Sequence, residues 1–204
     1  MKRILATTAA VVGLSVAAYA QGSIDVNNGS SLYGISSGSM ANYYGGIYGL
    51  EVWLLNGSSF DISTINTFAG NNALAAYNAL TANGFSLAGT FLGVNNSGPL
   101  AGFIQVGELE MPGVTPAGST VTIALAAWEG SGSSYLGAVN GGVVAMTTPT
   151  ANYTVNPRPT PPNLNSPWDA AGTDLIMTAV VPEPGTLALA GLGLVSLLAI
   201  RRRK

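Results

Sequence analysis

The pattern of apolar and polar positions divides this chain into two apolar ends and a long middle of short apolar runs. Residues 4–18 and 185–200 contain no charged residue, whereas between them β-branched and aromatic stretches alternate with Gly-, Ser- and Asn-rich turns. Short runs bounded by turn residues are typical of β-strands. The pattern therefore predicts an all-β domain over residues 21–181, placed between two terminal segments of a different kind.

The strand signals are spread over the whole middle region. Residues 47–55 combine aromatic and β-branched side chains and end at Asn56-Gly57, a frequent hairpin turn. Residues 121–125 alternate, which predicts one buried face. The same signals predict further strands at 23–26, 85–92, 102–110, 120–128, 142–147, 152–155 and 174–181. Many short strands with few helices indicate a single, mostly antiparallel β-sandwich of the jelly-roll type.

One stretch departs from the strand pattern. Over residues 71–81 apolar residues recur every three positions, Asn72 is placed to cap a helix, and Asn83-Gly84 is placed to end it. We expect one short helix there, and a further helical turn at 134–139.

Prolines mark another kind of segment. Residues 149–167 hold six of the eleven prolines of the chain. A proline fixes its own φ and lacks an N–H donor, so residues 157–162 should be extended and unable to form an interior strand. We expect this segment to cross outside the sheets and lead into the strand at 174–181.

The N-terminal segment has the features of a secretory signal peptide. Two basic residues precede the apolar run, and the small residues Ala18 and Ala20 have the spacing that signal peptidase requires. The run is shorter than the roughly 20 residues that span a bilayer. We expect cleavage of residues 1–20, so that the exported chain begins at Gln21. A retained N-terminal anchor is the alternative.

The C-terminal segment, residues 182–204, has three parts. Pro182, Glu183 and Pro184 come first, the apolar run 185–200 follows, and the chain closes on four basic residues, which are Arg201, Arg202, Arg203 and Lys204. Sixteen apolar residues rise about 24 Å as a helix, close to the hydrocarbon thickness of about 30 Å. The basic cluster should hold this end in the cytoplasm. We expect a transmembrane helix that anchors the domain outside the inner membrane.

These three parts together resemble the PEP-CTERM sorting signal. The resemblance implies that a membrane-embedded exosortase recognises Pro182-Glu183-Pro184 and removes the helix after it. It also implies that the protein passes through the secretion machinery and reaches the outer surface or extracellular polymer of a Gram-negative bacterium. A permanent tail anchor is the alternative.

The middle of the chain resembles the Gly-rich β-domains of verrucomicrobial PEP-CTERM proteins. The residues behind this resemblance are Ala127-Trp128-Glu129, Ser134-Tyr135 and Pro161-Pro162-Asn163-Leu164. It supports the β-domain and implies no activity.

Charge excludes one class of partner. Between Gln21 and Val180, Arg158 is the only basic residue among eight acidic ones, a net charge of −7. Such a region cannot neutralise phosphates, so we expect no nucleic-acid binding.

Composition also excludes several kinds of catalysis. The chain has no histidine and no cysteine, so it cannot form a Ser-His-Asp triad, a cysteine nucleophile or a histidine-ligated zinc site. We expect no cofactor and no enzymatic activity.

Carboxylate chemistry is the remaining option. Glu108 and Glu110 are two apart on an expected strand and should share a face. Two other acidic residues, Glu51 and Glu129, lie near tryptophans that could stack on a sugar, Trp53 and Trp128. The alternative is that the acidic residues face solvent and the tryptophans belong to the core.

Calcium is the one metal that the residues could hold, through oxygen ligands at Asp61, Asp169 and Asp174. Their spacing matches no calcium-binding loop.

These observations lead to one interpretation and two alternatives. The leading interpretation is a non-enzymatic structural or adhesive protein of the cell surface or extracellular matrix. A carbohydrate-binding module that contacts extracellular polysaccharide is the first alternative, and a carboxylate-dependent glycoside hydrolase or lyase is the second. The exposure of the three tryptophans distinguishes them.

Overall fold

Strands dominate the part of the chain that the structure describes. The computed structural model describes residues 22–95, 98–111, 113–114, 116, 118–152 and 158–180. In chain order the elements are β1 (Gly22–Asn27), β2 (Ile35–Ser37), β3 (Ile47–Asn56), α2 (Ser63–Asn66), α3 (Ala73–Ala82), β4 (Ser86–Asn95), the 3-10 helix η1 (Gly98–Leu100), β5 (Gln105–Met111), β6 (Thr120–Glu129), the 3-10 helix η2 (Tyr135–Gly137), β7 (Asn140–Pro149), β8 (Ala151–Asn152), α4 (Asn165–Ala171) and β9 (Leu175–Ala179).

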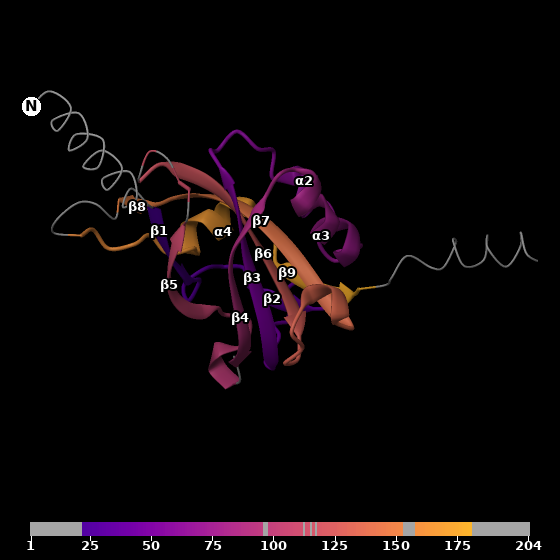
Figure 1. Cartoon of the computed structure of the whole chain (residues 1–204). Coiled ribbons are helices and arrows are strands. Elements are labelled where there is room, and N and C mark those ends of the chain that lie inside the picture. The colour runs from indigo at the N-terminus through magenta and orange to yellow at the C-terminus, as the bar shows by residue number, and fades with distance from the viewer. Residues whose placement is uncertain are drawn as a thin grey trace, which may run out of the picture.

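The strands form two sheets (Figure 1). The larger has six strands in the order β2-β9-β7-β6-β3-β4, and the smaller has three in the order β5-β1-β8. Named strands pair antiparallel except β2 and β9, which are parallel with Ile35 opposite Leu175. The apolar runs of β3 and β6 become central strands because β-branched and aromatic side chains fit a buried pleated surface.

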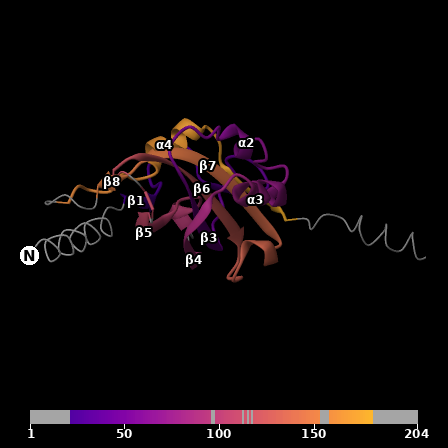
Figure 2. The ribbon, with the colours of Figure 1, turned by 45° about the horizontal axis from the view of Figure 1, so that its top comes forward.

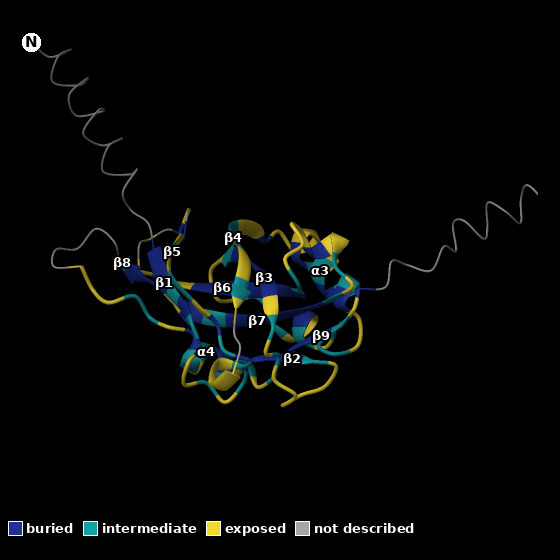
Figure 3. Ribbon diagram, turned by 90° about the horizontal axis from the view of Figure 1, so that it is seen from below, coloured by how far each residue is buried: buried dark blue, intermediate teal, exposed yellow. Residues whose placement is uncertain are grey.

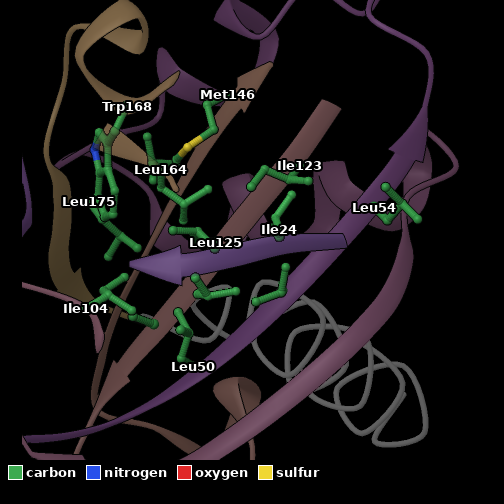
Figure 4. Close-up of a cluster of buried hydrophobic side chains, with 14 of the residues drawn as sticks. Ile24, Leu50, Leu54, Ile104, Ile123, Leu125, Met146, Leu164, Trp168 and Leu175 are labelled. Atoms are coloured by element: carbon green, nitrogen blue, oxygen red, sulfur yellow. The ribbon is translucent and has the colours of Figure 1, made fainter. Parts of the chain in front are cut away.

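A first core fills the space between the two sheets. β6 directs Ile123 and Leu125 toward Ile24 of β1, and Trp168 of α4 closes the same cluster (Figure 4). The side chains of this cluster come from both sheets, so burial of their apolar area stabilises the contact between the sheets.

A second core lies on the other face of the large sheet. The alternate residues of β6, Ala124 and Ala126, pack with Ile65 of α2 and Leu80 of α3. Small side chains on the strand leave room for the helices to approach. Figure 2 shows α2 and α3 on one side of the large sheet and β1, β5 and β8 on the other. The large sheet is therefore the middle of three layers.

This arrangement confirms a mostly β fold and corrects its details. Two sheets share a core, but the fold is not a jelly-roll sandwich with one helix, because α2 and α3 cover the second face and α4 borders the first core. Residues 121–125 were expected to have one buried face, yet both faces are buried. Figure 3 shows burial concentrated in β6 and β7, whereas β4 at the edge of the sheet is largely exposed.

The expected helix is confirmed as α3. The side chain of Asn72 accepts a 3.0 Å hydrogen bond from the N–H of Ala75, and Gly84, with φ of +79°, follows the helix end. The expected turn at 134–139 is η2. No local pattern predicts α2, α4 or β2. The strand predicted at 152–155 is β8 at its start, and residues 153–157 lie outside the described residues.

Residues 158–162 of the proline-rich segment form no strand, as expected, and the chain from Pro162 to Leu164 lies against β1. The N–H of Asp25 donates to the carbonyl of Pro162 (2.9 Å), and the N–H of Leu164 donates to the carbonyl of Asn27 (2.8 Å). The segment therefore hydrogen-bonds to β1. Proline lacks a donor but keeps its carbonyl acceptor, which is the group used here.

None of the helices in the described part of the chain is long and apolar enough to cross a membrane.

Candidate functional site

The described residues end at Val180, two positions before the C-terminal segment. This residue directly follows β9, is buried, and donates a 2.8 Å hydrogen bond from its N–H to the carbonyl of Val139. The predicted sorting and cleavage residues lie outside the described residues. They are Ala18, Ala20, Gln21, Pro182, Glu183, Pro184, Arg201, Arg202, Arg203 and Lys204.

Glu51 and Trp53 meet in the core under α3. The indole Nε1 of Trp53 donates to Oε2 of Glu51 (3.0 Å), and the hydroxyl of Tyr77 donates to the same oxygen (2.9 Å). Trp53 is 8% exposed and Glu51 is 7% exposed. The carboxylate is thus held by two internal donors that come from the sheet and from the helix above it.

Tyr77 extends this cluster toward η2. Its ring stacks on Tyr135 with centroids 4.3 Å apart, and the hydroxyl of Tyr135 donates to the carbonyl of Ala73 (3.0 Å). Burial raises the pKa of Tyr77, and the hydrogen bond to Glu51 raises it further. Burial also raises the pKa of Tyr135, with smaller contributions from Tyr77 and Glu51. Their surroundings therefore favour the neutral form of both phenols.

Trp128 is fully buried at the end of β6. Its Nε1 donates to the carbonyl of Gly132 (2.9 Å), and its ring packs edge-on against Tyr135. A Cβ atom on Gly49 would overlap the indole, so glycine is needed on the neighbouring strand. Trp168 is also fully buried. The structure does not support the sugar-stacking role predicted for Trp53 and Trp128, because both rings are buried in the second core, on the face that α2 and α3 cover.

Glu51 and Glu129 do not form a catalytic pair. Glu51 lies opposite Ala126 of the second core, whereas Glu129 is two residues from Ala127 of the first core and therefore projects from the other face of the sheet. The oxygens of Glu129 accept hydrogen bonds from the hydroxyl of Ser37 (3.2 Å) and from Nδ2 of Asn140 (2.8 Å). Two carboxylates on opposite faces of a sheet cannot flank one bond.

Glu108 and Glu110 share the outer face of β5, as the spacing predicts. Leu109 between them packs on the first core, and register places Asp25 of β1 opposite Glu108. Arg158 forms an ion pair with Glu108. The result is an acidic, outward-facing surface on the small sheet.

The three candidate calcium ligands have separate internal partners. Asp61 accepts from the N–H of Ser63 (3.0 Å), and hydrogen bonds from the Ser63 side chain and backbone lower its pKa. Asp169 accepts from the hydroxyl of Ser31 and the N–H of Leu32, both at 2.7 Å. Among the described residues, no three acidic side chains come together in a group that could hold a metal ion.

Asp174 is the most buried of the three, and its hydrogen bonds hold residues before, within and after β2. Its carboxylate accepts from the N–H of Gly34 (3.0 Å), the hydroxyl of Ser36 (2.8 Å) and the N–H of Ala41 (2.7 Å). No local pattern indicates this role, because the donors lie more than 130 positions away along the chain.

Comparison with known proteins identifies the C-terminal segment alone. Residues 180–204 match the family described as the PEP-CTERM protein-sorting motif. No curated protein and no solved structure matches the chain. The match begins at the residue where the described domain ends, and it indicates an exported protein that is sorted through exosortase.

Proposed function

We propose that this chain is a surface or extracellular-matrix protein whose domain has a structural or adhesive, non-enzymatic role and is released by exosortase at the Pro182-Glu183-Pro184 motif. The match of residues 180–204 to the sorting motif carries the proposal.

The position of the motif relative to the fold supports release of a complete domain. The last strand, β9, lies between β2 and β7 inside the large sheet and ends at Ala179. Each described element precedes residue 181. Cleavage at residues 182–184 therefore leaves every described strand and helix in the released product.

The internal use of the acidic side chains supports the non-enzymatic role. Glu51, Glu129, Asp169 and Asp174 each accept two or more hydrogen bonds from donors within the domain. Such carboxylates position strands and loops. The three tryptophans are buried and offer no exposed ring for a sugar to stack on, which argues against the carbohydrate-binding alternative.

Substitution of Pro182, Glu183 and Pro184 by alanine tests the proposal in a host that has exosortase. The full-length protein should then accumulate in the inner membrane, whereas the native protein should reach the surface with a smaller mass. Alanine at Gly185 and Thr186 is the matched control, since it alters the next two residues and leaves the motif intact. Equal mass and location of the triple variant and the native protein would contradict exosortase processing.

A further inference from the structure

The end of the large sheet from which the C-terminal segment leaves is made of aligned strand ends. Register places Asn140, the first residue of β7, opposite Ala179, the last residue of β9. It also places Glu129, the last residue of β6, opposite Tyr48 near the start of β3. β9, β7, β6 and β3 are neighbours in this order, so their ends form one continuous edge about 14 Å wide at a strand spacing of about 4.8 Å.

Three large apolar side chains are exposed along this edge. Ile47 at the start of β3 is 46% exposed, Leu136 in η2 is 60% exposed, and Val139 just before β7 is 79% exposed. We call these three residues the exit face. Val139 lies directly beside the departing chain, because its carbonyl accepts the hydrogen bond from Val180. Exposed apolar residues gathered at one place mark a contact surface.

The acidic side chain at this end of the sheet is engaged inside the domain. Glu129 is half-buried, and both of its oxygens accept hydrogen bonds. The loop between β6 and η2, residues 130–134, contains only glycine and serine. The exposed Glu108 and Glu110 belong to β5, which lies on the opposite side of the domain from the end of β9 (Figure 1).

The connection to the apolar run is short. Five Cα–Cα steps lead from Val180 to Gly185, where the uncharged run begins, and an extended chain of this length spans at most about 18 Å. A domain of this size is roughly 38 Å across, as its expected radius of gyration of about 15 Å implies. If residues 185–200 are in the bilayer, Val180 and the end of the sheet beside it lie within about 18 Å of the start of the apolar run, so this end of the domain faces the membrane.

We infer that the exit face binds the outer surface of the inner membrane, with Ile47, Leu136 and Val139 at the boundary of headgroups and acyl chains, while residues 185–200 are inserted. This inference rests on the proposed function, which supplies the inserted segment. Bacterial membranes present anionic lipid, which repels a domain with a net charge of −7. Approach by this end is favoured, because its acidic side chain, Glu129, is half-buried and hydrogen-bonded within the domain. The contact would hold residues 182–184 at the interface, within reach of an enzyme in the same bilayer.

Spin labelling of the full chain tests this contact, because a chain without cysteine takes one label per substitution. The full-length protein is reconstituted in vesicles of phosphatidylethanolamine and phosphatidylglycerol with a label at Val139→Cys, Leu87→Cys or Leu194→Cys. Leu87 is the matched control, since it is an exposed leucine (48%) near the start of β4. The other end of β4, at Asn95, is the end that pairs with Ile47 of the exit face. Circular dichroism verifies that each variant is folded, and Leu136→Cys replaces Val139→Cys if the latter does not fold.

The readout is the ratio of two collision rates of the label. The first is with oxygen, which partitions into lipid, and the second is with a water-soluble nickel chelate. It should be several-fold higher at position 139 than at position 87, and highest at position 194. If the label at position 194 is in lipid and the label at position 139 is in water, the exit-face contact is overturned and the anchoring is left intact. A label at 194 in water would overturn the anchoring itself. A label at 139 shielded from both reagents would indicate a protein contact, such as a second copy, and would also overturn the inference.

Discussion

The carboxylate of Asp174 holds the backbone of Ala41 in the left-handed region. Its Oδ2 accepts a 2.7 Å hydrogen bond from the N–H of Ala41, where φ is 61°. Among the described residues, Ala41 is the only non-glycine residue with a positive φ. Left-handed backbone costs a residue with a Cβ atom roughly 1 kcal/mol, so the hydrogen bond offsets local strain.

We predict that Asp174→Ala lowers the free energy of unfolding by about 3 kcal/mol, since it leaves three donors near the first core without their acceptor. Asp174→Asn retains one acceptor oxygen and should cost less. Urea unfolding measures both variants, with the exposed Asp61→Ala as a control of smaller effect. Equal stability of Asp174→Ala and Asp61→Ala would contradict the role of Asp174.

The contact between Gly49 and Trp128 gives a second prediction. Gly49→Ala should lower the free energy of unfolding by about 2 kcal/mol or more, because its Cβ would overlap the indole in a filled core. Gly132→Ala is the matched control, since a Cβ there lies 3.7 Å from Nε1 of the same tryptophan, an ordinary contact. Thermal unfolding should show a large loss for the first variant alone.

Alkaline pH should destabilise the domain through Tyr77 of α3, which is partly buried against the second core. The pKa of Tyr77 is raised above the ordinary 10.0, first by burial and then by Glu51. Above pH 10 the unfolded chain therefore loses a proton that the folded chain keeps, so stability is full below about pH 10 and declines as pH rises. Tyr77→Phe should be less stable at neutral pH but decline less steeply. Urea midpoints between about pH 8 and pH 11 check this, and parallel pH profiles would refute it.

Burial of the tryptophans predicts their behaviour in fluorescence. Acrylamide should quench the folded domain weakly and the urea-unfolded chain strongly, since the rings are at most 8% exposed. Addition of extracellular polysaccharide should leave the tryptophan spectrum unchanged. A blue shift on addition of polysaccharide would restore the carbohydrate-binding alternative.

Local sequence signals were sufficient for the elements that depend on them. The helix α3 was predictable because Asn72 caps its start and Asn83-Gly84 ends it. The strands β3 and β6 were predictable because their β-branched and aromatic runs end at turn residues.

Elements that depend on distant contacts were not predictable. The strand β2 has three residues and forms by pairing with β9, about 140 positions later. The helix α4 contains Pro167 in its first turn, so its sequence reads as part of the proline-rich segment. Trp53 and Trp128 were misleading because their burial depends on α2 and α3 covering the second face of the sheet, which no local pattern indicates.

The intact mass of the protein isolated from its native cell surface tests exosortase sorting most directly. We predict a chain that begins at Gln21, because Ala18 and Ala20 precede the cleavage point, and that lacks residues 185–204. The described domain would then be present without either apolar segment. A surface protein whose mass includes the apolar run and the basic residues up to Lys204 would contradict the account and identify a permanent tail anchor.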